Sequence, residues 1–449
     1  MPKIAFILPA IGKKTGEKYI KTWQLMEPLV ISTLKSLTPP DWETVFFDDR
    51  IELIDYNCGA DLVAITTEVY TALRAYDIAD QFRAKGATVI LGGYHATLNP
   101  QEAAAHGNSV LLGNAEGIWN QVLADWQAGR LQARYQGHCA YASVLPDRSI
   151  FAGKKYSVLG VIETGRGCIF HCEFCAITAF HQGHYHRKPV QRIVEEVKDS
   201  LKAGKKLFFF ADDNIVANTN HAIALFKALT PLKIRWSGQG SLTMARNPEL
   251  LYWIRKSGCT LMLIGYESLE DANLKQMNKE WARKLGDTAE LTKTIHKAGI
   301  NIYATFVFGY DHDSPETFRR TREFAEKMGF YVAAFNHLLP MPGTPLHQRL
   351  AAEDRLEQPT WWLSPGYLYG RLVFRPALMS PEELSQHCRR ARLLFYRPTS
   401  ILRRGLQALI RRPDPLLFFY YWYLNIQLGR EVDEKMDLPI GQNLDEMPK

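Results

Sequence analysis

The sequence lacks any apolar run of the roughly 18 to 20 residues that a membrane-spanning helix needs. Its first residues, MPKIAFILPAIG, lack the charged start, the longer apolar stretch and the cleavage site of a secretory signal. The sequence has seven cysteines, an odd number that cannot all pair within one chain. We therefore expect a cytoplasmic protein in which close-set cysteines serve a metal or catalysis.

Positive and negative charges nearly balance over most of the chain, although its formal net charge is +7. The excess lies in residues 389–412, which hold eight arginines and no carboxylate, and an aromatic block, 415–428, follows. One interpretation is peripheral membrane contact through 389–428 or a cover over an apolar substrate, and the other is a solvated basic face followed by a core helix. Nucleic-acid binding is not expected, because the aromatics form a block and do not alternate with the arginines.

The first 145 residues alternate short apolar runs with helix-like polar segments. The runs are 3–9, 44–50, 61–67, 87–95 and 109–116, and they predict an α/β domain, 1–145, built on a doubly wound parallel sheet. In such sheets ligands bind beyond the carboxyl ends of the strands. The candidate binding residues there are Thr66, Gly92, Gly93, His95, Gly113 and Glu116.

A second alternating series occupies residues 146–345 and contains six strand-like runs. Six strand–helix repeats in about 190 residues predict a partial barrel, (β/α)6, in place of a closed eight-stranded one. Polar residues collect where the strands end, and the candidates are Asp212, Asp213, Asn214, Gln239, Ser241 and Glu267. Residues 346–449 are expected to form a mainly helical, aromatic-rich C-terminal region.

Cys168, Cys172 and Cys175 follow the first strand of the second series with the spacing C-x3-C-x2-C. Four-iron clusters take one thiolate per iron, so three cysteines leave one iron open to a small-molecule ligand. The rival is zinc with a histidine as fourth ligand, from among His171, His181, His184 and His186. Structural zinc sites combine two short ligand hooks well apart in sequence, and no second hook is evident, which favours an iron–sulfur cluster.

This cysteine motif resembles the signature of the radical S-adenosylmethionine (radical SAM) superfamily. Further segments are similar to the family's cofactor-binding regions, namely Asp212 to Asn214 after the second strand, Glu267 after the fourth and Phe308 on the fifth. Each alone also fits a structural role, such as a helix cap or a surface carboxylate, but their order along successive strands favours the family. The resemblance implies a [4Fe-4S] cluster on the three cysteines, with S-adenosylmethionine chelating the open iron and Phe174 near its adenine.

The N-terminal domain resembles the Rossmann-like cobalamin-binding domain found in one branch of this superfamily. Gly92, Gly93, His95, Gly113 and Glu116 are similar to its loops. The chain lacks the Asp-x-His-x-x-Gly motif that supplies a lower cobalt ligand in classical cobalamin proteins, which leaves cobalamin binding open.

The resemblance implies reductive cleavage of S-adenosylmethionine to a 5'-deoxyadenosyl radical, with flavodoxin or ferredoxin as electron donor. With cobalamin, we expect methylation of an unactivated carbon in an organic substrate. Without it, the alternative is a radical dehydration, cyclisation or rearrangement. A third reading, a non-catalytic iron–sulfur sensor or scaffold, needs the cysteines but not Asp213 or Glu267. Aromatic residues of the C-terminal region either line a pocket for a large apolar substrate, such as a polycyclic lipid or a tetrapyrrole, or form core.

Overall fold

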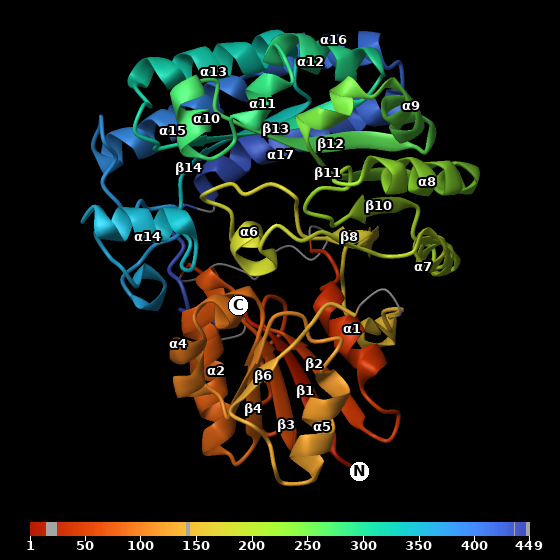
Figure 1. Ribbon diagram of the computed structural model, residues 1–449, viewed down its shortest axis with the longest axis vertical. Helices are drawn as coiled ribbons and strands as arrows, with labels where there is room; N and C mark the ends of the chain where they lie inside the picture. The colour runs from red at the N-terminus through yellow and green to blue at the C-terminus, as the bar shows by residue number, and fades with distance from the viewer. Residues whose placement is uncertain (15–24, 141–143, 435, 446–449) are drawn as a thin grey trace.

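A computed structural model describes residues 1–14, 25–140, 144–434 and 436–445 (Figure 1). Its N-terminal part is a six-stranded parallel sheet with the order β2-β1-β3-β4-β5-β6. The strands are β1 (Lys3–Leu8), β2 (Glu43–Asp48), β3 (Leu62–Thr66), β4 (Thr88–Gly92), β5 (Ser109–Leu112) and β6 (Arg134–Gln136). One of them, β6, was not among the five strands predicted from the sequence. Only one of its three residues is buried, so it carries little apolar signal.

Helices cover both faces of this sheet. On β1, Ile4 and Phe6 pack toward α1 (Leu29–Leu37) and α5 (Trp119–Gln127), while Ala5 and Ile7 pack toward α2 (Ala72–Ala84). The short helices α3 (Tyr94–Leu98) and α4 (Pro100–His106) lie on the α2 side (Figure 1). Because alternate side chains of each strand are buried on opposite faces, the predicted doubly wound α/β architecture is confirmed.

The second sheet is also parallel and has the order β14-β13-β12-β11-β10-β7. Its strands are β7 (Leu159–Ile162), β10 (Leu207–Phe210), β11 (Arg235–Gly240), β12 (Cys259–Glu267), β13 (Asn301–Phe308) and β14 (Val332–His337). The helices between them are α7 (Val190–Lys202), α8 (Thr219–Leu229), α9 (Pro248–Lys256), α10 (Asp271–Gln276), α11 (Trp281–Lys284), α12 (Thr288–Lys297) and α13 (Pro315–Met328). The first and last strands do not pair, so the predicted partial barrel is open.

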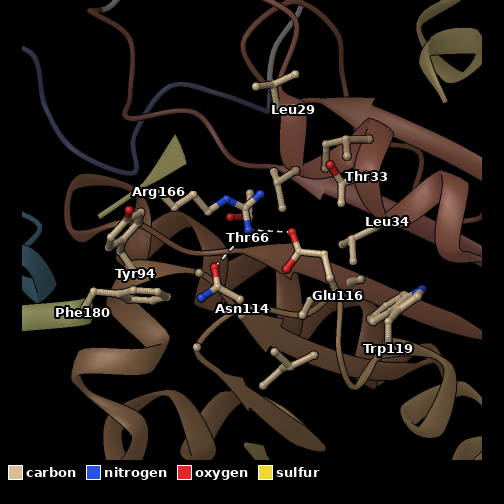
Figure 2. A pocket seen from close by; sticks show the side chains of 18 of the residues that line it. Leu29, Thr33, Leu34, Thr66, Tyr94, Asn114, Glu116, Trp119, Arg166 and Phe180 are labelled. Atoms are coloured by element: carbon tan, nitrogen blue, oxygen red, sulfur yellow. Dashed lines mark hydrogen bonds and ion pairs between the residues drawn. The ribbon is translucent and has the colours of Figure 1, made fainter. Parts of the chain in front are cut away.

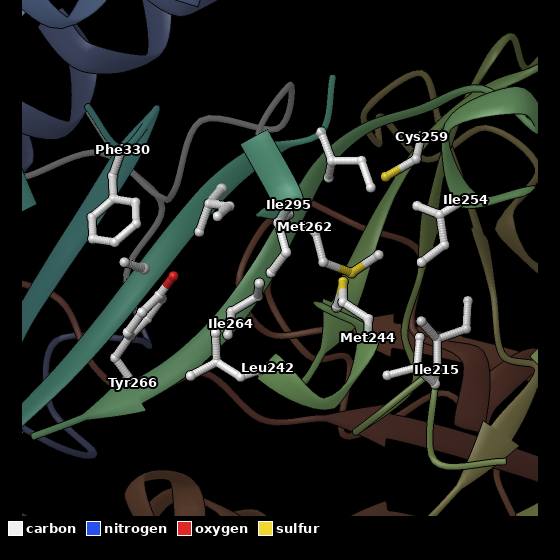
Figure 3. Close-up of a cluster of buried hydrophobic side chains, with 14 of the residues drawn as sticks. Ile215, Leu242, Met244, Ile254, Cys259, Met262, Ile264, Tyr266, Ile295 and Phe330 are labelled. Carbon is white, nitrogen blue, oxygen red and sulfur yellow. The ribbon is translucent and has the colours of Figure 1, made fainter. Parts of the chain in front are cut away.

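The main core lies between the barrel strands and their helices (Figure 3). Met262 and Ile264 of β12 contribute to it, and Tyr266 on the same face hydrogen-bonds to Thr292 of α12. On β13, Ala304, Phe306 and Phe308 belong to this outer core. The residues between them, such as Thr305, therefore face the inside of the barrel. A small hairpin, β8 (Gly165–Arg166) with β9 (His186–Arg187), and α6 (Ala176–His181) flank the cysteine motif.

Local sequence signals explain where the helices begin and end. For α13, Ser314 and Thr317 form a capping box and Pro315 occupies the first turn, where its missing N–H has no partner to lose. The helix ends at Gly329, whose φ of +65° is a left-handed conformation that glycine adopts without strain. Single-turn 3-10 helices add connections at Val69–Thr71, Arg148–Phe151, Thr230–Leu232, Leu242–Arg246 and Trp361–Leu363.

The C-terminal residues form α14 (Pro345–Ala352), α15 (Pro381–Phe395), α16 (Pro398–Arg411) and α17 (Pro415–Glu434). One arginine of the basic segment, Arg404, is fully buried and donates to the carbonyls of Phe330 and Phe395 and to Asn425 of α17. Of the aromatics, Trp361 and Trp362 belong to the core of the N-terminal sheet. Among the described residues, no helix is both long enough and apolar enough to cross a membrane.

Candidate functional site

The three cysteines of the motif line one cavity of about 390 Å³, here called the cysteine cavity. It opens at the carboxyl ends of the barrel strands, where β11, β12, β13 and the loops after β7 and β10 meet. Six other residues singled out from the sequence also line it, namely Phe174, Asp213, Asn214, Gln239, Ser241 and Glu267. The topology therefore gathers residues that are up to a hundred positions apart in the chain.

Cys172 is buried, and Cys168 and Cys175 are half-buried. Burial raises the pKa of Cys172 to about 12 and also raises the pKa of Cys175. In the part of the chain that the structure describes, no three His, Cys, Asp or Glu side chains converge tightly enough for one metal ion. Zinc needs its ligands about 2.0–2.3 Å from a single point, whereas a four-iron cluster takes one thiolate at each iron.

An ion pair between Glu267 and Lys279 closes one side of the cysteine cavity. Lys279 Nζ lies 3.0 Å from Glu267 Oε1 and donates to the carbonyl of Gly265 at 2.9 Å. Burial lowers the pKa of Lys279, but the charge and hydrogen bond of Glu267 together with the nearby Cys172 and Cys168 outweigh it, and the net shift is upward. Glu267 has a φ of +63°, a conformation that costs a non-glycine residue about 1–3 kcal/mol and is typical of functional sites. Sequence reasoning missed Lys279, because it comes from the loop after α10 and not from a strand end.

Two predicted cofactor residues of the barrel lie outside this cavity. Asp212 is buried and accepts hydrogen bonds from the backbone N–H and the hydroxyl of Thr164, so it joins the ends of β10 and β7. Burial raises the pKa of Asp212 to about 8, which these hydrogen bonds oppose. Phe308 stacks on Phe318 in the outer core, with ring centroids 4.2 Å apart. The inward neighbours on the same strand, Thr305 and Val307, line the cavity instead.

A second cavity, of about 250 Å³, lies at the carboxyl ends of β3, β4 and β5 and is here called the N-terminal cavity (Figure 2). Five of the predicted residues line it: Thr66, Gly92, Gly93, Gly113 and Glu116. Apolar residues of α1 and the indole of Trp119 complete the wall. The sixth, His95, points elsewhere, because its buried Nε2 lies 2.8 Å from Glu102 and its ring contacts Trp362.

Arg166 lines the N-terminal cavity and lies close in sequence to the cysteine motif. Its guanidinium lies 2.6 Å from Glu116 Oε1 and 2.7 Å from Glu163 Oε2, and it donates to Asn114 at 3.0 Å (Figure 2). The side chain is only 16% exposed. Burial lowers the pKa of Arg166, but the two carboxylates together raise this pKa by more than burial lowers it. The guanidinium therefore keeps its charge. Because Arg166 is two residues before Cys168, this network fixes the cysteine loop against the N-terminal sheet.

Helix α6 forms the wall between the cavities. Ile177 and Thr178 line the cysteine cavity, and Phe180 and His181 line the N-terminal cavity. Phe180 packs on Tyr94 with ring centroids 4.5 Å apart. The sequence placed Tyr94 in the candidate turn Gly92 to His95, and the Gly-Arg-Gly triplet before the first cysteine was visible, but nothing there indicated that Arg166 or Phe180 would belong to the site.

Fold and site together define an enzyme of the α/β class in which a doubly wound sheet faces the open end of a partial barrel that carries three thiols. Residues 162–325 match the family model described as the radical SAM superfamily. These residues therefore carry a radical SAM domain. As a radical SAM enzyme it uses an organic substrate and an electron donor.

The chain is 29% identical to bacteriochlorophyllide d C-12(1)-methyltransferase of Chlorobaculum tepidum, over 94% of this chain and 96% of that protein. It is also 29% identical to bacteriochlorophyllide d C-8(2)-methyltransferase of the same organism, over 74% and 78%. Among solved structures, TsrM from Kitasatospora setae, with cobalamin and a [4Fe-4S] cluster bound, has a TM-score of 0.64 at 16% identity, covering 86% of this chain and 82% of that one. OxsB, a cobalamin-dependent radical enzyme, has a TM-score of 0.70 at 13% identity, covering 96% and 72%. Both structures share the fold.

Proposed function

We propose that this protein is a cobalamin-dependent radical SAM methyltransferase that methylates an unactivated carbon. The observation that carries the proposal is the pair of cavities on either side of α6. A methyl carrier and a radical source must both reach one substrate carbon, and two adjoining sites allow this. The relatives named as methyltransferases, one of them aligned over nearly the whole chain, support the same activity.

When bound, the cluster and S-adenosylmethionine supply the radical that removes a hydrogen atom, and cobalamin supplies the methyl group. In this proposal Cys168, Cys172 and Cys175 hold the cluster and leave one iron free for S-adenosylmethionine. Asp213 accepts from the backbone N–H of Gly167 at 2.8 Å and so orders the loop before the first ligand. Asn214 donates to the Cys168 thiol sulfur at 3.9 Å. The buried Glu267–Lys279 pair offers a carboxylate on the cavity wall to a ribose hydroxyl.

For the N-terminal cavity, the fit to cobalamin depends on its apolar interior and on the close approach that its glycines permit. Trp119, Leu34 and Ile90 offer an apolar surface to an aromatic tail, while Gly92 and Gly93 leave the backbone accessible. His95 takes no part, since it is held by Glu102. The proposed division of the chain is 1–145 for cobalamin, 146–345 for the cluster and S-adenosylmethionine, and 346–449 for the substrate.

The finer partners are part of the same proposal. The substrate is large and apolar, which agrees with the bacteriochlorophyllide d in the names of two relatives. Flavodoxin or ferredoxin supplies the electron. A peripheral membrane contact would use the exposed side chains of Leu402, Leu406 and Ile410 on α16 and Phe419 on α17, beside the exposed Arg403.

The test is the metal content of three proteins purified without oxygen from cells supplied with cobalamin. The wild type should hold about four irons and one cobalt per chain. C172A should lose the iron and keep the cobalt, and G93A should lose the cobalt and keep the iron, because each change affects one cavity. Iron without cobalt in the wild type would contradict the methyl-transfer proposal and favour direct radical chemistry. The absence of iron from the wild type would contradict the radical mechanism altogether.

A further inference from the structure

A third cavity, of about 400 Å³, lies on the inner side of the barrel and is here called the inner cavity. Its walls come from β13, β14, α15 and α17, with Tyr70 from the N-terminal part and Tyr369 and Gly370 from the C-terminal part. Its volume is in the range of about 300–1,000 Å³ that is typical of ligand pockets. Neither the cluster nor the cobalamin proposal uses this cavity.

The inner cavity adjoins the cysteine cavity. Asn336 lines both of them. On β13 the inward positions run from Tyr303, in the inner cavity, to Thr305 and Val307, in the cysteine cavity. Since these residues are spaced by two along one strand, their side chains lie in a row on the same face of the sheet. A long molecule can therefore occupy the inner cavity and extend one end toward the cluster.

The walls of the inner cavity combine aromatic rings with cationic groups. Four tyrosines line it, Tyr70, Tyr303, Tyr369 and Tyr396, and the rings of Tyr70 and Tyr369 pack with centroids 4.8 Å apart. Arg389 and Arg392 of α15 also line it, together with one carboxylate, Glu431. Burial lowers the pKa of His337, also in the wall, to about 4, so its imidazole is neutral near pH 7. Flat apolar surfaces with two guanidinium groups suit a large ring system that bears a carboxylate.

Arg392 lies at the junction of the two cavities. Its Nη2 donates to Asn336 Oδ1 at 2.5 Å, and its Nε donates to the carbonyl of Phe335 at 2.9 Å. These bonds fix the guanidinium on the cavity wall. They also fix the amide of Asn336, which lies in the walls of both cavities.

We propose that the inner cavity is the substrate chamber, that the substrate is a large polycyclic or macrocyclic carboxylate, and that Arg392 binds its carboxylate while Asn336 positions the reacting end. The role of the inner cavity as a substrate chamber rests on the proposed methyltransferase function. Its test does not, because substrate binding can be measured without turnover.

The test uses the cluster-loaded full chain without S-adenosylmethionine or cobalamin, and two probes, mesoporphyrin IX, which is a dicarboxylate, and its dimethyl ester. Porphyrin fluorescence gives the Kd of each. R392M should weaken binding of the acid about ten- to hundredfold, the effect of losing a charged hydrogen bond, and should change the ester Kd less than about threefold. A334F, which adds a ring to the cavity wall, should weaken both probes at least tenfold. R390M is the matched control, because Arg390 is an exposed neighbour on α15, and should change neither Kd.

Unchanged Kd values in A334F would overturn the assignment of the inner cavity as the substrate chamber, because the probes would then bind elsewhere. Equal weakening of acid and ester in R392M would overturn the carboxylate assignment. Binding as expected in a protein that takes up no cobalt would leave the chamber standing and contradict the methyl-transfer proposal alone.

Discussion

Replacing Arg166 by methionine keeps the length of the side chain and removes the cation that Glu116 and Glu163 share. Arg166 is 16% exposed and Glu116 is 4% exposed, so R166M leaves two nearly buried carboxylates without their partner. Breaking a buried ion pair in this way costs about 3–5 kcal/mol. With about 1.4 kcal/mol per power of ten, the ratio of folded to unfolded protein falls by roughly two to four powers of ten.

The loss in R166M should depend on pH. Burial raises the pKa of Glu163 and Arg166 opposes that rise, so the pKa of Glu163 climbs further in the variant. A carboxyl group whose pKa is raised on folding lowers stability as pH rises from its unfolded pKa through its folded pKa. The deficit of R166M should therefore be larger at pH 8 than at pH 5.5.

Urea titrations followed by circular dichroism at these two pH values measure the effect. R192M is the control, because Arg192 pairs with Glu195 at an exposed position, 45% and 41% accessible, where an ion pair contributes about 0–1 kcal/mol. The reasoning is refuted if R166M lies within about 1 kcal/mol of R192M, or if its deficit grows as the pH falls.

Three further predictions concern the two cofactor cavities. G93A should destabilise the protein by more than G129A in urea titrations, because both residues have positive φ but only the Cβ at Gly93 would meet backbone atoms, at 2.8 Å from the Thr67 carbonyl oxygen; equal losses would show that the contact relaxes. K279M should weaken S-adenosylmethionine binding about tenfold or more by calorimetry on the cluster-loaded protein, since Glu267 loses the cation that holds it, and unchanged affinity would contradict this role. D212N should flatten the fall of the unfolding free energy between about pH 4 and pH 8, because the pKa of Asp212 is raised to about 8 in the folded protein and wild-type stability decreases as pH rises through that window; parallel curves for the two proteins would contradict it.

The sequence predicted the order of the strands along the chain and the loops at their ends. It did not predict which of two neighbouring side chains at a strand end faces the site. Asp213 lines the cysteine cavity while Asp212 is tied to Thr164, and Val307 lines it while Phe308 belongs to the outer core. Strands of a parallel sheet are covered on both faces, so their sequences are apolar throughout and carry no alternation that would tell the inside from the outside. A shift of one residue exchanges the two faces.

Contacts between distant segments were beyond prediction for a different reason. Glu102 explains the position of His95 only with the tertiary structure in hand, because it also accepts from the indole N–H of Trp362, 260 residues away. No local pattern encodes such a contact. The sequence marked His95 as a ligand residue because it follows a Gly-Gly turn, which is a property of the strand end and not of the side chain.

The division of the C-terminal aromatics has a consequence for how the substrate is enclosed. Trp361 and Trp362 pack into the core of the N-terminal sheet, whereas Tyr421 and Asn425 of α17 contact Tyr331, which directly precedes β14 of the barrel. The C-terminal region thus contacts both other parts of the chain and contributes Tyr369 and α15 to the inner cavity between these contacts. A radical formed at the cluster must be kept from water, and a chamber walled by all three parts of the chain excludes solvent only when they are assembled together.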